Sequence, residues 1–370
     1  MMEIDSLEIL ERYITENASL RGAALRDLDL RDHTDLLKSI IISQTVFLGC
    51  TMDKELMASL IDNNLIFPSI SMPFDPYTNS LYRTEDLYRN FDRHDPKSYI
   101  KTPDAQIYNH YVSTKRDKDS ILETFARRLH DYSITNALND EIRRFDEKKV
   151  SAIMGGHSLK RGDENYFKAA LISKRLCEEG YLMLSGGGPG AMEATHLGAW
   201  FAKRDEAEMH DSIDILKKGE SYKDELWLSA AFEVMETYPK KNDTISDIGI
   251  PTWHYGHEPP TPFAARIAKY FANSVREEGL LALAKGGIVY TPGSAGTIQE
   301  IFQDAAQNHY KSYDFASPMV FLGKEYWTHE KPVYGILKDL SKDYDYGKLI
   351  SIHDDVDEIV KRIINFSKGN

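Results

Sequence analysis

The sequence predicts an α/β protein in which a parallel sheet is flanked by helices and preceded by an additional, mainly helical N-terminal domain. From residue 150 onward, short apolar runs alternate with stretches of helical periodicity. Such alternation is typical of a parallel sheet wrapped by helices. The runs predict strands at 150–155, 181–185, 244–250, 287–291, 318–322 and 349–353, and helices at 164–179, 190–203, 223–235, 263–278, 297–309 and 356–366.

The length of 370 residues predicts two domains, because single hydrophobic cores seldom grow to that size. Residues 1–147 differ from the remainder and predict helices at 6–15, 54–62 and 120–149 with one strand at 45–49. This half contains no convergent acid, base, nucleophile or phosphate loop. We therefore interpret 1–147 as an α-rich accessory or regulatory domain, and 148–370 as the domain that carries the ligand-binding motifs.

The composition excludes several kinds of partner. A net charge of -13 and a pI near 5.4 argue against a broad nucleic-acid or membrane-surface footprint, which needs clustered Lys and Arg. No apolar run approaches the ~20 residues of a membrane span, and the acidic N-terminus lacks a signal core. Cys50 and Cys177 are too few for a disulfide framework, which suits a reducing compartment. We therefore expect a cytoplasmic protein with no nucleic-acid and no membrane partner.

A glycine-containing turn at 292–297 has the sequence Pro-Gly-Ser-Ala-Gly-Thr and joins the predicted strand 287–291 to the helix 297–309. A turn of this kind exposes backbone N–H groups at the positive end of a helix dipole, where a phosphate or carboxylate binds. Glu300 follows one turn into the helix. Its carboxylate either faces the ligand that the turn holds or only complements the helix dipole.

A second glycine-rich turn at 186–190 has the sequence Gly-Gly-Gly-Pro-Gly and is followed closely by Met192. It formally contains G-x-G-x-x-A, with Asp205 about 20 residues further on, so a dinucleotide site is one interpretation. Two features argue against it: these glycines follow the second strand of the region, and Pro189 removes backbone freedom where a pyrophosphate would lie. Neither turn ends in Gly-Lys-Ser/Thr, so triphosphate chemistry is unsupported.

His254 and His257, in the loop at 251–262, have a spacing that metal ligands use. No cysteine and no convincing acidic partner lies near them in the sequence, so we interpret them as ordinary loop histidines. The motifs require neither a metal nor a cofactor, and we expect none.

The two turns together, the second running P-G-x-x-G-T-x-x-E, resemble those of the LOG family of Rossmann-like nucleotide-processing proteins. The similarity covers about 150–366. The GGGPGAM segment and the EPPTP segment at 258–262 look most like the long bacterial branch, the nucleotide 5'-monophosphate nucleosidases, which carry an extra N-terminal domain. The resemblance implies a Rossmann-like, LOG-type catalytic domain that hydrolyses the N-glycosidic bond of nucleoside 5'-monophosphates to free base and ribose 5-phosphate.

The same resemblance implies which residues form the site. The acid of the P-G-x-x-G-T-x-x-E motif falls on Glu300, and the family's catalytic arginine falls on Arg276. Because a guanidinium is a poor proton donor, Arg276 is expected to orient Glu300 or to bind ligand hydroxyls or phosphate. The positions that hold the nucleotide and its phosphate fall on Gly156, His157, Ser158, Gly187, Gly188, Met192, Gly293, Ser294, Ala295, Gly296 and Thr297.

The sequence departs from the family pattern in three respects, one of which is an interval from Arg276 to Pro292 that is one residue longer than usual. Ser294 replaces the second glycine of the usual P-G-G, and Glu277 follows Arg276 where the short plant-type members have a basic residue. A serine either adopts a left-handed turn at modest strain or gives the phosphate an extra hydroxyl donor. These departures concern the choice of substrate more than the fold.

Two other functions stay open. The same loops serve a non-catalytic nucleotide-sensing module, and related folds bind single-stranded DNA, although the acidic balance disfavours that function. The resemblance also implies a homodimer or higher homo-oligomer, since family members commonly complete one another's sites. The apolar face of the predicted helix within 263–284 fits such a contact.

Overall fold

The computed structural model describes residues 2–116, 120–241, 245–256 and 258–369. The chain forms two compact units, which are described separately: Met1–Ser80 with Ser113–Ala137, and Leu81–Val112 with Leu138–Asn370. The predicted domain boundary at residue 147 stays a prediction.

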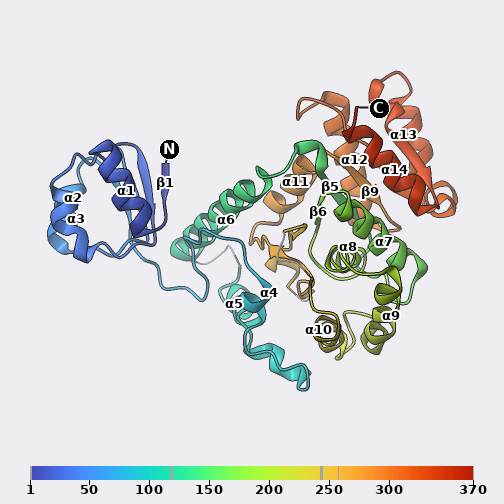
Figure 1. Ribbon diagram of the computed structural model, residues 1–370, viewed down its shortest axis with the longest axis horizontal. Helices are drawn as coiled ribbons and strands as arrows, with labels where there is room; N and C mark the ends of the chain where they lie inside the picture. Colours follow the sequence, from blue (N-terminus) through green and yellow to red (C-terminus); the bar gives the residue numbers. More distant parts are fainter. Residues whose placement is uncertain (1, 117–119, 242–244, 257, 370) are drawn as a thin grey trace. The chain divides into compact units, whose positions relative to one another are not determined.

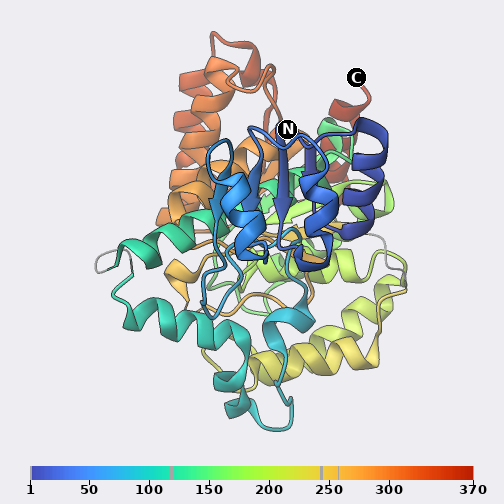
Figure 2. The same cartoon turned by 90° about the vertical axis from the view of Figure 1, so that its left-hand side faces the viewer.

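The first unit contains a four-stranded parallel sheet whose strands follow one another in chain order (Figure 2). Helical residues outnumber strand residues here, as expected, although only the strand near 45–49 was predicted. The apolar faces of the helices cover the sheet and form a core that includes Leu10, Leu25 and Phe47. The elements are β1 (Met2–Ile4), α1 (Leu7–Asn17), β2 (Ala23–Arg26), α2 (Thr34–Lys38), β3 (Val46–Leu48), α3 (Lys54–Leu60), β4 (Leu65–Phe67) and the start of α6 (Ile121–Ile142).

The second unit is built on a seven-stranded sheet in which all neighbouring strands are parallel (Figure 1). The strand order is β11-β10-β9-β5-β6-β7-β8. The strands are β5 (Val150–Met154), β6 (Leu182–Ser185), β7 (Asp247–Gly249), β8 (Arg266–Ile267), β9 (Gly287–Tyr290), β10 (Met319–Leu322) and β11 (Ile350–His353). The predicted Rossmann-like fold with an additional helical region is thereby confirmed.

Helices cover this sheet, and an apolar core lies between them and the strands. Ile153, Met183 and Val289 contribute from the strands to that core, where α7 packs against both α8 and α14. The helices of the second unit are α4 (Thr84–Tyr88), α5 (Pro103–Ser113), α7 (Glu164–Glu178), α8 (Ala191–Trp200), α9 (Glu206–Leu216), α10 (Trp227–Thr237), α11 (Asn273–Leu283), α12 (Ala295–Tyr310), α13 (Val333–Ser341) and α14 (Val356–Ser367). Within the described ranges, no helix combines the length and the apolar character that crossing a membrane requires.

The predicted helix at 263–278 is wrong in its first half. Residues 266–267 form β8, which pairs with β7, and the extended chain continues beyond it. The Ala268 N–H donates to Gly249 O at 2.8 Å and the Tyr270 N–H donates to Pro251 O at 3.0 Å. These sheet hydrogen bonds compete successfully with local helical periodicity, so α11 begins only after Ala272.

The chain order reverses at the centre of the sheet. After β5 the chain adds β6, β7 and β8 on one side, and it then returns to place β9, β10 and β11 on the other side. The carboxyl ends of β5 and β9 therefore flank the point where loops diverge above and below the sheet. Ligands of open α/β sheets bind at such a switch point.

The contact between α7 and α8 depends on a glycine. A Cβ built on Gly198 of α8 would lie 2.0 Å from Ala170 O of α7, so the two helix backbones meet where Gly198 has no side chain. Gly279 offers a matched comparison, because it also lies inside a helix but a Cβ there would meet nothing within 4 Å.

We predict opposite effects of alanine at these two helical glycines. Gly198→Ala forces the helices apart and should lower the free energy of unfolding by about 2 kcal/mol or more. Gly279→Ala should raise it by up to ~1 kcal/mol, because alanine loses less backbone entropy on forming a helix. Urea denaturation of the two variants and the wild type measures both values. Equal effects would show that the α7–α8 contact is not as close as described.

Candidate functional site

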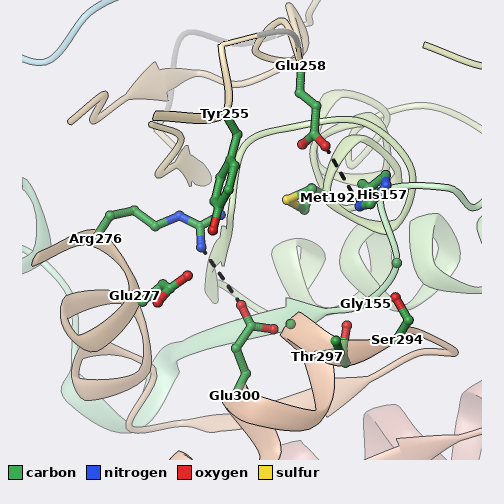
Figure 3. Close-up of a pocket in the computed structure, with 13 residues that line it drawn as sticks. Gly155, His157, Met192, Tyr255, Glu258, Arg276, Glu277, Ser294, Thr297 and Glu300 are labelled. Atoms are coloured by element: carbon green, nitrogen blue, oxygen red, sulfur yellow. Dashed lines mark ion pairs between the residues drawn. The ribbon is translucent and has the colours of Figure 1, made fainter. Parts of the chain in front are cut away.

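A cavity of about 440 Å³ opens at the carboxyl ends of β5 and β9 (Figure 3). Loops after β5, β7 and β9 and the first turns of α8, α11 and α12 form its walls. The lining residues are Gly155, Gly156, His157, Met192, Tyr255, Glu258, Arg276, Glu277, Ser294, Ala295, Gly296, Thr297 and Glu300. Within the described ranges, no three His, Cys, Asp or Glu side chains gather as a set of metal ligands.

The first turn of α12 supplies the side of the cavity that suits an anion. Helix α12 begins at Ala295, two residues earlier than predicted, so Ala295, Gly296 and Thr297 form its first turn. The Ser294 side chain makes no capping hydrogen bond to this turn, and Figure 3 shows it at the cavity wall. The first N–H groups of a helix lack intrahelical acceptors, and with the helix dipole they favour a phosphate or carboxylate.

Ser294 has a φ of -112° and is therefore not in the left-handed region. Of the two possibilities for Ser294, the left-handed turn is therefore not adopted. The other possibility, a hydroxyl donor to a bound phosphate, stays a prediction. The turn is fixed from the neighbouring residues: Tyr326 donates from its hydroxyl to Gly293 O at 2.6 Å, and Gly156 N–H donates to Pro292 O at 3.1 Å.

Glu300 and Arg276 meet on the adjoining wall. The Arg276 Nη1 atom lies 3.9 Å from Glu300 Oε1, and Arg276 Nε donates to Ile250 O at 3.0 Å. Both side chains are largely buried, with 11% and 18% of their surfaces exposed. Gly186 makes room for the guanidinium, since a Cβ on it would lie 2.6 Å from Arg276 Nη2. The first glycine of the glycine-rich turn thus leaves the space that the Arg276 guanidinium occupies.

Burial raises the pKa of Glu300 to about 7, against the opposing effect of the Arg276 charge. Glu277, the neighbouring carboxylate, raises the pKa further. Glu277 accepts hydrogen bonds from Asn273 Nδ2 at 2.7 Å and from Gln299 Nε2 at 3.4 Å, which hold it beside the cavity. A carboxyl group with a pKa near 7 exchanges a proton readily at neutral pH, as a general acid or base must.

The opposite wall carries a second polar pair. His157 Nδ1 lies 3.8 Å from Glu258 Oε1, which is an ion-pair distance and too long for a hydrogen bond (Figure 3). The His157 ring also packs edge-on against Tyr222, with 5.8 Å between the ring centres. Tyr255 and Met192 lie between the two walls and offer aromatic and apolar surface.

The glycine-rich turn at 186–190 packs against the loop after β5 that lines the cavity. Gly187 has a φ of +67° and Gly190 a φ of +70°, and a Cβ on Gly190 would lie 2.3 Å from Gly156 O. Only glycine combines this backbone conformation with so close an approach. The Gly187 N–H donates to Ser185 Oγ at 3.0 Å. Ser185 in turn lies 2.8 Å from the buried His196 ring.

His196 completes a buried Ser-His-Asp arrangement. Its Nδ1 lies 2.7 Å from Asp247 Oδ1, and Ser185 Oγ lies beside its Nε2. All three side chains have no exposed surface. A nucleophilic serine must reach its substrate, so this arrangement is structural: it fixes the glycine-rich turn to β6, α8 and β7.

The structure brings most of the expected site residues to one cavity: Gly156, His157, Met192, Arg276, Ser294, Ala295, Gly296, Thr297 and Glu300. Four others are absent from the lining. Ser158 is exposed beyond the loop, Gly187 and Gly188 lie in the supporting turn, and the Gly293 carbonyl is held by Tyr326. The roles of all these residues in binding stay predictions.

The lining also includes Gly155, Tyr255, Glu258 and Glu277, which were not among the expected site residues. Glu258 begins the EPPTP segment and Glu277 adjoins Arg276, so both had a signal in the sequence; Tyr255 had none. His254 lies in the short helix before Tyr255, where its ring packs edge-on against the Tyr255 ring. His257 lies outside the described residues.

No protein-family model and no curated protein matches this chain. Solved structures with similarity include a molybdenum cofactor binding protein from the phototrophic bacterium Rippkaea orientalis, at 14% identity and a TM-score of 0.37, over 60% of this chain and 95% of that one. The molybdenum cofactor carrier protein from Chlamydomonas reinhardtii is similar at 16% identity and a TM-score of 0.37, over 59% of this chain and 98% of that one. The chemistry of the cavity therefore rests on its own residues.

We predict that two buried acids make the stability of the protein fall between about pH 4 and pH 7. Burial raises the pKa of both Glu300 and Asp304 to about 7 from ordinary values of 4.5 and 3.8. The folded state therefore favours the protonated carboxyls, so this stabilisation is complete below the ordinary values and is lost as the pH rises through about 7.

Glu300→Gln and Asp304→Asn remove these titrations. The difference in unfolding free energy between each variant and the wild type should change in favour of the variant as the pH rises from 4 to 8. The expected change is on the order of 2 kcal/mol. Urea denaturation at a series of pH values measures this difference. A constant difference between variant and wild type across that range would contradict the raised pKa.

Proposed function

We propose that this chain hydrolyses the N-glycosidic bond of nucleoside 5'-monophosphates, as its resemblance to the LOG family implies. The observation that carries the proposal is the position of Glu300. It lies one turn inside the helix whose N-terminus suits a phosphate, and its carboxylate faces the same cavity beside Arg276. An anion site and a titratable carboxyl thus share one cavity large enough for a small ligand.

The proposed reaction follows from the chemistry of the bond. Breaking the C1'–N bond creates positive charge on the sugar, which a nearby carboxylate stabilises, and a water molecule then adds to C1'. Glu300 is the group proposed for this role, since it can accept the proton of that water. The phosphate, held at the first turn of α12, positions C1' without taking part in bond cleavage.

Arg276 is proposed to position and not to transfer a proton. Its Nε is held by Ile250 O, while Nη1 faces Glu300 and Nη2 lies near Gly186. A guanidinium fixed in this way keeps the Glu300 carboxylate in place and presents N–H donors to ligand oxygen atoms. The reaction needs neither a metal nor a cofactor.

The alternative is a nucleotide-sensing module in which the same cavity binds a nucleotide without cleaving it. In either case residues 1–147 are proposed to be an accessory or regulatory domain. The proposal includes a cytoplasmic setting, which the two free cysteines, Cys50 and Cys177, suit.

We predict that Glu300→Gln abolishes hydrolysis and largely preserves binding. The substitution keeps the shape of the side chain but removes the negative charge that stabilises the cationic sugar. The value of kcat should therefore fall about a hundredfold or more. Affinity for the nucleotide should change far less, because the phosphate is held by backbone N–H groups. Released base and ribose 5-phosphate are measured with a panel of purine and pyrimidine monophosphates.

Asp304→Asn is the matched control. Asp304 is a buried acid one turn further along α12, but it accepts a hydrogen bond from Tyr290 and does not line the cavity. The Asp304→Asn variant should retain activity, and the pH dependence of its unfolding free energy should change as that of Glu300→Gln does. If the wild-type protein binds nucleotides but releases base from none of them, the hydrolase function is wrong and the nucleotide-sensing function takes its place.

We also propose that the chain self-associates, although the surface expected to support this is not exposed. Phe263, Phe271, Leu280 and Leu281 are buried within the second unit. The proposal therefore rests on the family resemblance alone. Analytical ultracentrifugation at micromolar concentration should show a species heavier than the 42.2 kDa chain, and a single species of that mass would contradict it.

A further inference from the structure

The two polar pairs of the cavity lie on opposite walls. Arg276 and Glu300 come from α11 and α12, whereas His157 comes from the loop after β5 and Glu258 from the loop after β7 (Figure 3). A ligand in this cavity has one pair on each side. The proposed hydrolysis assigns work to only one of the pairs.

Cleavage of an N-glycosidic bond makes a demand at both of its ends. The electron pair of the C1'–N bond passes to the leaving base, and a neutral purine or pyrimidine leaves poorly unless one of its ring nitrogens receives a proton. Arg276 cannot supply that proton at neutral pH. Glu300 is already engaged with the sugar and the water, and the other wall carries a histidine, the side chain that most often acts as a general acid.

His157 lies in a well-defined position on that wall. The backbone of its loop is fixed at the preceding residue, because Gly156 N–H donates to Pro292 O at 3.1 Å and Gly156 O accepts from Ala191 N–H at 3.2 Å. Its Nδ1 faces Glu258, while the packing of Tyr222 against its edge limits rotation of the ring. A carboxylate beside one ring nitrogen orients an imidazole and leaves Nε2 to meet a ligand.

Resting on the proposed hydrolase function, we propose that His157 is the general acid for the leaving base and that Glu258 positions it. As the C1'–N bond breaks, its electron pair passes to the base, and the proton on His157 Nε2 passes to a ring nitrogen of that base. Water adds to C1' and gives its proton to Glu300. The products are the neutral base and ribose 5-phosphate, and proton exchange with solvent restores both side chains.

The test compares two substrates of nearly the same shape. Guanosine 5'-monophosphate needs a proton on its leaving base, whereas N7-methylguanosine 5'-monophosphate already carries a positive charge on the base, which leaves as a neutral molecule. Nicotinamide mononucleotide offers a second cationic base. Loss of a general acid should therefore slow the neutral substrates and spare the cationic ones.

His157→Gln should reduce kcat for neutral-base nucleotides by about a hundredfold or more, with little change in KM, while kcat for the cationic substrates falls less than about fivefold. Glu258→Gln should show the same selectivity with a smaller effect. About half of the His157 side chain is exposed, so the substitution should leave the fold intact. His210→Gln, on α9 and away from the cavity, is the control for replacing a histidine.

An equal loss on neutral and cationic substrates would overturn the proposal and assign His157 to binding alone, while the hydrolase function would stand. If the wild type cleaves neutral nucleotides but no cationic one, the pH profile of kcat decides. Loss of the alkaline limb in His157→Gln supports the proposal, and its retention overturns it. A wild type that cleaves no nucleotide at all removes the hydrolase function together with this inference.

Discussion

The close approach of three loops, at the carboxyl ends of β5, β6 and β9, is the constraint on which the site depends. Gly156 N–H donates to Pro292 O, and a Cβ on Gly190 would collide with Gly156 O, so the three loop backbones touch. This contact places the first turn of α12 beside the loop that carries His157. It also explains two of the glycines, since a Cβ on Gly190 would meet the backbone of Gly156 and His157, and a Cβ on Gly186 would meet the guanidinium of Arg276.

Burial of charge gives the site its chemistry. Burial of the Glu300 carboxyl raises its pKa to about 7 against the effect of the Arg276 guanidinium 3.9 Å away, and the nearby Glu277 carboxylate adds to the rise. Asp304, on the same helix, reaches a similar value by burial although Tyr290 hydrogen-bonds to it. These two acids have similarly raised pKa values but differ in access to a ligand, because of the two only Glu300 lines the cavity. Access to the cavity is what distinguishes the acid proposed to act on a ligand, Glu300, from Asp304, which is only part of the structure.

Much of the second unit was predictable from the sequence, because strands buried on both faces appear as short apolar runs and glycine turns mark where they end. The predictions failed where long-range pairing decides the local structure. Residues 266–270 have helical periodicity but lie beside β7, and the strands of the first unit are too short to show a pattern. In the site, Arg276 required the family resemblance, whereas Glu300 also had a signal in the glycine-containing turn before it. Tyr255 enters only through the fold of the loop that contains it.

That loop explains why residues 81–112 belong to the second unit. Thr84 donates from its hydroxyl to Pro262 O at 2.7 Å, and Tyr88 donates to Pro260 O, so α4 holds the segment that follows Glu258. Asp104 of α5 accepts a hydrogen bond from Trp253 at 3.0 Å and pairs with Lys269 in a buried site. A fragment starting at residue 148 would leave Lys269 buried without this carboxylate, which is far more costly than losing a surface ion pair. The wall that carries Tyr255 and Glu258 therefore depends on residues that the sequence alone assigns to the accessory domain.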